Sequence, residues 1–406
     1  MTGEWIVQIL DKKNYFKQHL VLIPGNLPAL KPSSLRVQTE VLCLTSNNFT
    51  YCKLADMANW WDVHPIPPNT PAPFNDPATY GRISCWGYAK VLESTFEGVP
   101  AGSHVWGYLP IGTLPIDFEV KTGNVENQVI VTEAYRQNQL PLYNRYLVFP
   151  ESIGKEIEAK TDGVAYDSLF RVTHLTGYLM AEYMFAQDPK QSINLTPEQA
   201  DLSGATVINF APGSKVGLAF TYALKHGRTA SKPRQIVGAA SDYSKAFVES
   251  TGLYDAVEST LADPFEALAR LNHPKDSKIV IVDFGGRHFL QWKWAAMLVS
   301  QYPKVQFIIV GAEVSAPDAA VAPPGEPPAG LDISQVMADG LQNLAIQKAG
   351  EKEYFAGVNA AWEGLRKDGI PGFKVNWGEG MEAVKAGWTK YAENKVAAEE
   401  GLVFKV

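Results

Sequence analysis

Apolar side chains follow three different spacings along this chain. Residues 1–150 carry short apolar runs separated by Pro, Gly, Tyr and Trp, a pattern typical of short strands joined by turns. Residues 166–185 repeat apolar side chains at helical spacing. From residue 205 onward, apolar β-branched runs alternate with helical patterns, at 206–210, 235–239, 278–284 and 305–310. The alternation predicts an α/β chain with a doubly wound parallel sheet, preceded by a β-rich region.

A proline-rich stretch interrupts the pattern after the last of these runs. Residues 315–330, SAPDAAVAPPGEPPAG, can form neither a helix nor a central strand, so we expect a loop that serves as a spacer rather than as a lid. Helical patterns follow, and a short apolar run occupies 402–406. The sequence contains 406 residues, enough for about two domains with a core each.

The turn after the first strand of the alternating region is the most informative motif. A strand, a tight turn, a helix and a second strand form the unit that holds a dinucleotide across its first turn. The G-x-G-x-x-G fingerprint is incomplete here, because Ala211 stands where the first glycine is expected and Pro212 removes one donor. An ordinary turn without a ligand is the alternative. The residues predicted to contact the phosphates are Gly213, Ser214, Lys215, Val216 and Gly217.

The end of the second strand bears on the choice of cofactor. It reads Gly238-Ala239-Ala240, small and uncharged, whereas NAD selection usually needs an acidic residue there to bind the ribose 2′-hydroxyl. Ser241 follows and Lys245 lies one helical turn later, so that a hydroxyl and an ammonium group on one face would suit a 2′-phosphate. This arrangement favours NADPH. Asp242 is the counter-evidence, because it would be the acidic ribose ligand if the strand ran longer.

Composition narrows the functional class. The net charge is −7 and no basic patch occurs, so we expect no nucleic-acid partner. No apolar run reaches the ~18 residues typical of a membrane span, and the first residues lack the apolar region of a signal peptide. The cysteines Cys43, Cys52 and Cys85 are odd in number and widely spaced, which argues for a reducing compartment. We therefore expect a cytoplasmic protein with a small-molecule substrate, no membrane partner and, at most, a homodimeric assembly.

The order of these regions resembles the medium-chain dehydrogenase/reductase superfamily. Residues 45–51 (TSNNFTY) resemble the family's Asn-aromatic-x-Asp segment at the catalytic cleft, and 81–91 with 100–107 resemble its glycine-bearing hairpin. Thr176-Gly177-Tyr178 resembles its Thr-Ala-Tyr motif, and Ser241-x-x-x-Lys245 resembles the NADPH clamp of the quinone oxidoreductase branch. Two further segments, 85–89 (CWGYA) and 140–146 (LPLYNRY), are similar to an outlying branch whose members are largely of unassigned function.

The resemblance implies a GroES-like β-rich catalytic domain and a Rossmann-type nucleotide-binding domain. The first would span 1–158 and be completed by 343–406, and the second would span 159–342 and carry the loop at 315–330. Gly81-Arg82-Ile83 stands where zinc-dependent members have Gly-His-Glu, and no run of four cysteines occurs. We therefore expect a zinc-independent protein without metal ligands. Cys52 and His64 could be imagined as ligands, but a buried cysteine and a loop histidine explain them more simply.

The candidate catalytic side chains lie in two segments. Tyr51 is a plausible proton donor, and Asn48 could hydrogen-bond a carbonyl or enolate oxygen. The alternative for Tyr51 is a packed core tyrosine. The resemblance implies that Thr176 holds the nicotinamide carboxamide. Gly285 and Gly311 follow or end later strands of the predicted sheet, where the backbone can turn close to the cofactor.

These observations predict an NADPH-dependent reductase of an enone, a quinone or a related carbonyl compound, for example in secondary metabolism. The hydride chemistry would belong to the cofactor. Two alternatives stay open. The same fold could perform a non-redox isomerisation, cyclisation or elimination, which the imperfect turn and the missing family acids motivate. The chain could also bind a small molecule without catalysis.

Overall fold

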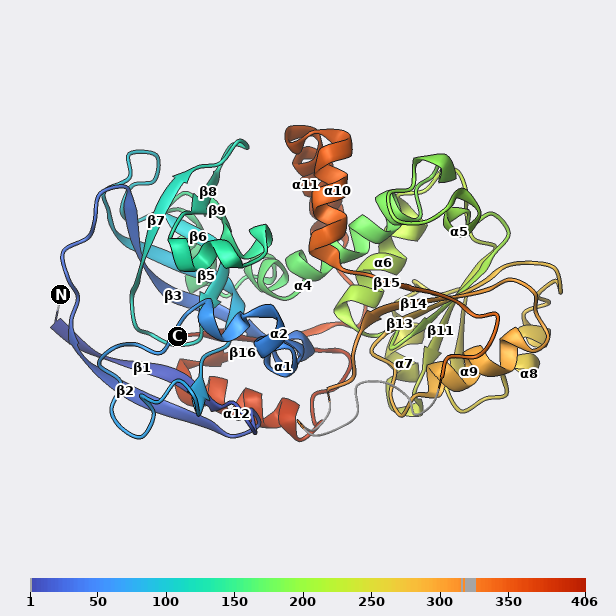
Figure 1. Ribbon diagram of the computed structural model, residues 1–406, viewed down its shortest axis with the longest axis horizontal. Helices are drawn as coiled ribbons and strands as arrows, with labels where there is room; N and C mark the ends of the chain where they lie inside the picture. Colours follow the sequence, from blue (N-terminus) through green and yellow to red (C-terminus); the bar gives the residue numbers. More distant parts are fainter. Residues whose placement is uncertain (1, 315–316, 318–325) are drawn as a thin grey trace.

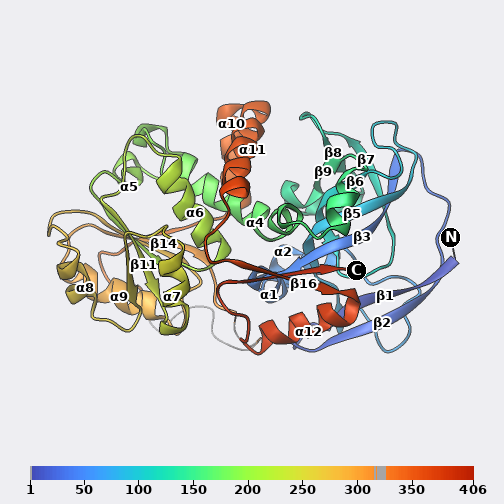
Figure 2. The same cartoon turned by 180° about the vertical axis from the view of Figure 1, so that it is seen from behind.

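The computed structural model describes residues 2–314, 317 and 326–406, and the chain forms two lobes (Figure 1). A β-rich lobe carries both ends of the chain, and a parallel-sheet lobe lies opposite. Helix α4 (Asp162–Tyr178) runs between them, with α10 (Ala338–Ala349) and α11 (Glu351–Asp368) beside it (Figure 2). The predicted fold class, a GroES-like β-rich part plus a doubly wound parallel sheet, is confirmed. Most of the predicted loop at 315–330 lies outside the described residues.

Strand β3 (Ser34–Leu44) organises the β-rich lobe, because three strands pair with it. One edge pairs antiparallel with β5 (Ser84–Ser94). On the other edge, residues 34–37 pair with β7 (Ile116–Thr122) and residues 41–44 pair with β17 (Glu400–Lys405). The pairing with β7 closes a barrel, whose other strands are β6 (His104–Pro110), β9 (Arg145–Phe149) and β8 (Gln128–Val131). Because β3 and β7 pair with each other, neither strand has a free edge where the barrel closes.

The C-terminal part of the chain returns to this lobe. Strand β16 (Lys374–Glu379) pairs in parallel with β17, and α12 (Gly380–Ala392) packs between them and the hairpin of β1 (Thr2–Asp11) and β2 (Gln18–Asn26). Trp388 is completely buried there and donates its indole N–H to the Tyr15 carbonyl at 3.0 Å. The remaining elements of the lobe are β4 (Tyr80–Gly81), α1 (Ser46–Lys53), α2 (Ala55–Ala58), η1 (Trp60–Asp62), η2 (Ala134–Asn138), η3 (Pro141–Asn144) and α3 (Ile153–Glu158).

The second lobe is a six-stranded parallel sheet in the order β12-β11-β10-β13-β14-β15. Its central strands β10 (Thr206–Phe210) and β13 (Ile279–Phe284) are buried at every residue, which is why most of their residues are apolar. The chain winds outward from β10 in both directions, so β10 and β13 flank the switch point where such sheets bind ligands. The other strands are β11 (Gln235–Ala240), β12 (Ala256–Ser259), β14 (Val305–Gly311) and β15 (Asp332–Gln335).

Helices cover both faces of this sheet (Figures 1 and 2). Helix α6 (Lys215–His226) crosses α4 closely at Gly177, where an added Cβ would lie 2.7 Å from the Phe220 nitrogen. The other elements are η4 (Leu179–Met184), η5 (Pro189–Gln191), α5 (Pro197–Ala200), α7 (Asp242–Ser250), α8 (Pro264–Arg270) and α9 (Leu290–Val299). None of the described helices combines the length and apolar character that crossing a membrane requires.

A buried carboxylate on α4 links the β-rich lobe to α11. Asp167 has a side chain that is 2% exposed, and Tyr88 of β5 donates its hydroxyl to Oδ2 at 2.7 Å. From α11, Trp362 Nε1 donates to Oδ1 at 3.0 Å and Arg366 Nε lies 3.3 Å from Oδ2. Arg171, one turn later on α4, completes the set at 3.1 Å. One charge therefore connects the barrel, the joining helix and the C-terminal helix.

Replacing Asp167 with Ala should lower the free energy of unfolding by about 3–5 kcal/mol, because it leaves two guanidinium groups and a buried tyrosine hydroxyl without their shared acceptor. Urea denaturation followed by tryptophan fluorescence measures the change. Glu363→Gln is the control, since its exposed ion pair with Arg366 spans 4.0 Å and should contribute less than about 1 kcal/mol. Equal midpoints for the two variants would contradict the central role of Asp167.

Candidate functional site

The turn at the carboxyl end of β10 leads directly into α6. Ala211 adopts φ +52°, and Ser214 is the N-cap of the helix, accepting the Gly217 N–H on its hydroxyl at 3.1 Å. The Leu218 N–H bonds the Ser214 carbonyl at 2.8 Å. Among the described residues, the N–H groups of Lys215 and Val216 have no acceptor. These two donors at a helix N-terminus are suited to an anion.

The two glycines of this turn face different surroundings. A Cβ added at Gly217 would lie 3.2 Å from both the Ala211 carbonyl oxygen and the Phe284 ring, so Gly217 permits close packing of α6 on the sheet. If Gly217 is taken as the third glycine of a G-x-G-x-x-G fingerprint, Ser214 stands at the position of the second glycine. A Cβ added at Gly213 would lie 3.3 Å from Cβ of Ala398, in the segment before β17. The C-terminal return therefore covers this side of the turn.

The Lys215 side chain turns away from the backbone donors and toward the β-rich lobe. Its ammonium group lies 5.3 Å from the ring centre of Phe373 and 6.0 Å from that of Phe170. The one acceptor recorded for it among the described residues is the Glu400 carbonyl, at 3.5 Å. Burial lowers the pKa of Lys215 to about 8. A lysine with a lowered pKa thus stands where the two lobes meet.

The end of β11 presents the residues predicted to choose the cofactor. Ser241 is exposed, and its hydroxyl lies 3.1 Å from that of Ser244. The Lys245 ammonium is half-exposed and only loosely paired with Glu249, at 4.0 Å. Asp242, the competing acid, accepts a hydrogen bond from Ser259 at 3.0 Å. Its carboxylate is thus engaged with the end of β12, while Ser241 and Lys245 remain accessible.

The neighbouring strands β13 and β14 end in glycine. Gly285 has φ +112°, and a Cβ added there would lie 2.8 Å from the Ala312 carbonyl oxygen. A Cβ at Gly311 would lie 2.7 Å from the Phe284 carbonyl oxygen, so the two strand ends touch. The buried Asp283 carboxylate caps the turn by accepting the Gly285 N–H at 2.9 Å, while burial raises the pKa of Asp283.

Thr176 lies near the end of α4, one residue before the close crossing with α6. It is half-buried, and its hydroxyl has no hydrogen-bond partner among the described residues. The free hydroxyl and the open donors of α6 are therefore both available to a ligand. This group of residues, with the ends of β11, β13 and β14, is the part of the predicted site that the sheet brings together.

Asn48 and Tyr51 lie instead in the packed interior of the β-rich lobe. Both amide atoms of Asn48 are used, because Oδ1 accepts the Thr45 N–H at 2.8 Å and Nδ2 donates to the Ser84 carbonyl at 3.1 Å. Tyr51 is 4% exposed, and its Oη accepts hydrogen bonds from Asn47 Nδ2 at 2.7 Å and Trp86 Nε1 at 3.0 Å. Burial raises the pKa of Tyr51 to about 12, although both donors favour the phenolate.

No group of three or more His, Cys, Asp or Glu side chains among the described residues could hold a metal ion. Cys52 is buried, and His64 is engaged by Ser84 at 2.6 Å and by Arg136 at 3.2 Å. Independence of zinc stays a prediction.

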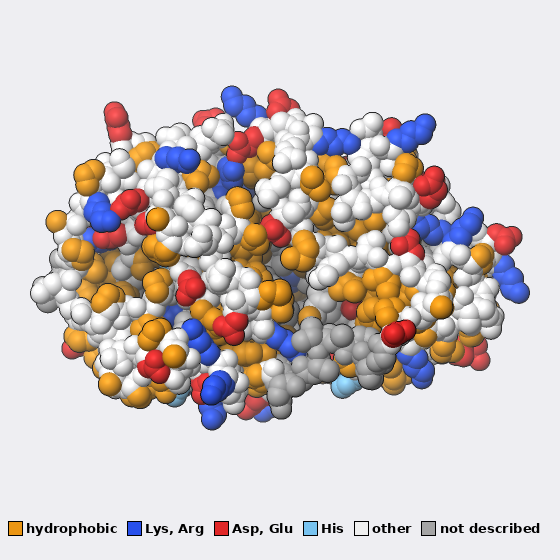
Figure 3. All heavy atoms as spheres, viewed as in Figure 1, with side chains coloured by type: hydrophobic (Ala, Val, Ile, Leu, Met, Phe, Trp, Pro, Cys, Tyr) orange, Lys and Arg blue, Asp and Glu red, His pale blue; other side chains and the backbone are white. Residues whose placement is uncertain are grey.

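On the face drawn in Figure 3, Lys and Arg side chains are interspersed with Asp and Glu.

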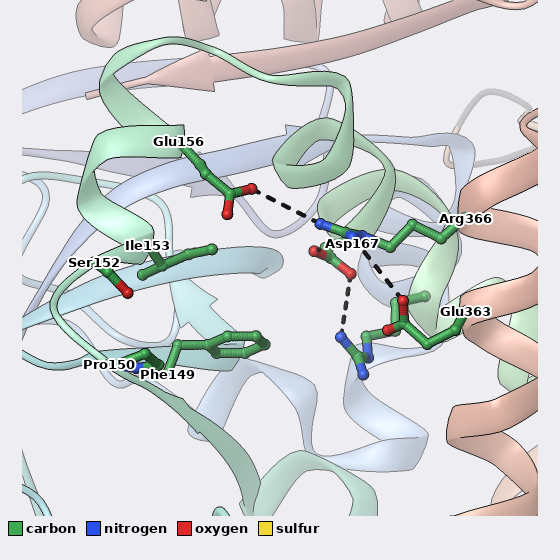
Figure 4. A pocket seen from close by; sticks show the side chains of 9 residues that line it. Phe149, Pro150, Ser152, Ile153, Glu156, Asp167, Glu363 and Arg366 are labelled. Atoms are coloured by element: carbon green, nitrogen blue, oxygen red, sulfur yellow. Dashed lines mark hydrogen bonds and ion pairs between the residues drawn. The ribbon is translucent and has the colours of Figure 1, made fainter.

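A cavity of about 300 Å³ lies beside Asp167, between the β-rich lobe and α11 (Figure 4). Its charged walls hold the guanidinium groups of Arg171 and Arg366 and three carboxylates, those of Asp167, Glu156 and Glu363. The carboxylates bind both arginines, so most of the charge is paired within the wall, with one more carboxylate than guanidinium group. This cavity is part of the connection between the lobes, and none of the predicted site residues lines it.

A family model described as "Protein of unknown function (DUF2855)" matches residues 42–397. The chain belongs to the DUF2855 family. A search of curated proteins found no match.

Solved structures share the fold of this DUF2855 protein. A mutant enoyl thioester reductase from Candida tropicalis has 12% identity and a TM-score of 0.58, with 100% of both chains covered. CurA from Vibrio vulnificus has 12% identity and a TM-score of 0.58, covering 100% of this chain and 99% of its own. A putative NADPH:quinone reductase from Bacillus thuringiensis has 11% identity and a TM-score of 0.57, again covering 100% and 99%. At such identities the likeness shows the two-lobed fold alone.

Sequence reasoning missed two features of the site. The contact of Ala398 with the turn, and the 2.9 Å hydrogen bond from Arg287 to Asn394, arise from the C-terminal return, which no local pattern connects to residue 213. The position of the half-buried Lys215 side chain was also missed, since only its backbone N–H was expected to act. A signal existed, because a lysine directly after an N-cap serine opposes the helix dipole.

The Lys215 environment predicts a pH dependence of stability. Burial lowers its folded-state pKa from 10.5 to about 8, so unfolding takes up a proton between these values and stability should rise with pH there. Lys215→Met should be more stable than wild type below pH 8, and the difference should vanish near pH 10.5. Urea midpoints across this range measure it. Lys293→Met, at an exposed position of α9, is the control and should track the wild type.

Proposed function

We propose that this DUF2855 protein is a zinc-independent, NADPH-dependent oxidoreductase that reduces an enone, a quinone or a related small carbonyl compound. The observation that carries the proposal is the end of β11, where Ser241 and Lys245 are accessible and one oxygen of the exposed Asp242 carboxylate accepts a hydrogen bond from Ser259. A hydroxyl and an ammonium group suit a 2′-phosphate, whereas NADH would need the acid. Proteins of the same fold that were solved in complex with NADPH or NADP support it.

The residues fit a dinucleotide at the switch point of the sheet. The free N–H groups of Lys215 and Val216 would bind the pyrophosphate, Ser241 and Lys245 the 2′-phosphate, and Thr176 the nicotinamide carboxamide. Gly213, Ser214 and Gly217 shape the turn, and Gly285 and Gly311 keep side chains away from the ends of β13 and β14. When bound, the cofactor would supply a hydride.

Tyr51 is proposed to supply the proton, with Asn48 beside it. Asn47 and Trp86 donate to Tyr51 Oη, the Tyr143 side chain is a further hydrogen-bond partner, and all three would stabilise the phenolate left behind. With its pKa raised to about 12, the phenol stays protonated at neutral pH. Asn48 holds the start of α1 against β5 through the Ser84 carbonyl, and it would have to exchange that bond to reach a carbonyl or enolate oxygen.

A non-redox reaction on the same fold is the second candidate. It is favoured by Ser214, whose hydroxyl occupies the Gly217 N–H that a phosphate would otherwise use, and by Ala398, which covers Gly213. Isomerisation, cyclisation or elimination would need no dinucleotide there. The proposal also includes a cytoplasmic location, a small-molecule substrate and a homodimer.

The cofactor assignment predicts that NADPH binds more tightly than NADH. Lys245→Glu should weaken NADPH binding by about 10- to 100-fold, the effect of losing a hydrogen bond to a charged group, and should hardly change NADH binding. Fluorescence titration with both cofactors measures this. Lys293→Glu makes the same charge change on exposed α9 and should leave both affinities as in wild type. Equal affinity for the two cofactors, or none for either, would refute the assignment.

The reaction is tested by following NADPH absorbance and product together over a panel of enones and quinones, with and without a chelator. Tyr51→Phe should lower turnover by about 10²–10⁴, the usual weight of a positioned general acid. It should also lower the free energy of unfolding by about 1–3 kcal/mol, since two buried donors lose their acceptor. Tyr302→Phe, whose hydroxyl has no hydrogen bond among the described residues, is the control for stability.

Three outcomes would change the proposal in different ways. Product formed while the NADPH signal stays flat would favour the non-redox reaction and leave the fold untouched. Full turnover in Tyr51→Phe would remove only the proton-donor role. Loss of activity with chelator, together with stoichiometric zinc by elemental analysis, would overturn zinc independence.

A further inference from the structure

Four arginines are buried in the described part of the chain: Arg36, Arg82, Arg136 and Arg228. A guanidinium group stays charged in proteins and presents five N–H donors, so a buried one is costly unless acceptors surround it. Of the four, Arg36 has the strongest acceptor, a carboxylate. Its Nε and one terminal nitrogen each donate to a different oxygen of Asp117, both at 2.8 Å, in the two-pronged geometry of an arginine–carboxylate pair.

Two of the others find neutral acceptors. Arg136 is completely buried, and it donates from Nε to Asn144 at 3.1 Å and from a terminal nitrogen to the Tyr143 carbonyl at 2.6 Å. Arg228 donates to backbone carbonyls, including that of Ala181 at 2.9 Å. Both terminal nitrogens of Arg136 and of Arg228 therefore have a hydrogen-bond acceptor.

Arg82 differs from all three. It lies between β4 and β5, is 3% exposed, and has one acceptor among the described residues, the Pro65 carbonyl, at 3.4 Å from Nη1. Its Nε and Nη2 are buried without a partner, and no ion pair in the described chain includes it. These two atoms form the same edge with which Arg36 binds Asp117. Burial lowers the pKa of Arg82 to about 10, with no nearby acid to oppose it.

The surroundings of Arg82 add positive rather than negative charge. His64 precedes the Pro65 carbonyl, and Arg136 donates to its Nε2 at 3.2 Å, which leaves Nδ1 to donate to Ser84 at 2.6 Å. The pKa of His64 is held well below its usual range by burial and by the two guanidinium groups, so the ring is neutral. The Glu133 carboxylate raises the pKa of Arg136 through its charge, but its Oε1 accepts the Glu119 N–H and its Oε2 is buried without a hydrogen-bond partner.

We propose that the Nε–Nη2 edge of Arg82 is the binding site of a small carboxylate-bearing molecule within the β-rich lobe. A planar carboxylate offers two oxygens at the spacing of the two unpaired donors and supplies the missing negative charge. Entry requires movement of the exposed segment that begins at Pro65, which Arg82 holds by a single long hydrogen bond. The site goes beyond the proposed reaction and does not depend on it.

The site also adjoins the segment that carries Asn48. Ser84 lies two residues after Arg82, and its carbonyl accepts the Asn48 amide at 3.1 Å. A ligand held at Arg82 would thus lie close to the start of α1. Whether the carboxylate belongs to a substrate or to a separate effector is decided by whether acetate competes with turnover.

The test compares acetate and formate with chloride at equal ionic strength, with thermal unfolding and calorimetric titration as readouts. Wild type should show a saturable rise in Tm with either carboxylate and none with chloride, because a ligand that binds only the folded state stabilises it. Arg82→Met should bind acetate about 10- to 100-fold more weakly. Arg270→Met removes an arginine whose side chain is 52% exposed and should keep the wild-type response.

Two further comparisons make the result decisive. In chloride alone Arg82→Met should be at least as stable as wild type, because it removes a buried unpaired charge. Arg82→Lys keeps the charge and the polar head but loses the two-donor edge, so it should fold and lose the acetate response. Identical Tm curves in acetate and chloride, an acetate response that survives in Arg82→Lys, or a strongly destabilised Arg82→Met in chloride would each overturn the proposal.

Discussion

One buried negative charge holds the β-rich lobe against the helix that joins the two lobes and against α11. Asp167 lies on the helix that joins them, and it accepts hydrogen bonds from the barrel and from α11 while Trp106 of β6 binds its backbone carbonyl at 3.1 Å. Polar groups at such a depth are stable only when their partners are all present. The barrel, α4 and α11 must therefore pack against one another before the Asp167 side chain has all its partners.

The sheet of the second lobe could be predicted from sequence because parallel strands are buried on both faces. Runs such as Ile279–Phe284 are apolar at all but one residue, and helices separate them. The carboxyl ends of these strands meet at one edge by topology, so the placement of the turn at 211–217 and of Ser241 beside the switch point followed from the pattern. What a pattern cannot supply is contact with segments distant in sequence, such as Ala398 against Gly213.

The β-rich lobe was less predictable, for a physical reason. In a barrel crowded with aromatic rings, the same residue types serve catalysis and packing, and local sequence does not tell which way a side chain points. Tyr51 illustrates this, because its ring lies 4.7 Å from that of Trp60 and 5.2 Å from that of Tyr108 while its hydroxyl collects two donors. Arg82 illustrates the opposite case, since its unpaired edge becomes visible only when every possible acceptor around it is known.

The divided edge of β3 also constrains the order in which the chain can form its structure during synthesis. Residues 34–37 find their partner in β7, some eighty residues later, but residues 41–44 wait for β17 at 400–405. The parallel sheet between 206 and 335 needs nothing from the C-terminal return to form its ladders. As the chain leaves the ribosome, this sheet can therefore form while half an edge of β3 is still unpaired. An exposed strand edge of that kind is where unwanted pairing between nascent chains begins, and the last strand to emerge removes it.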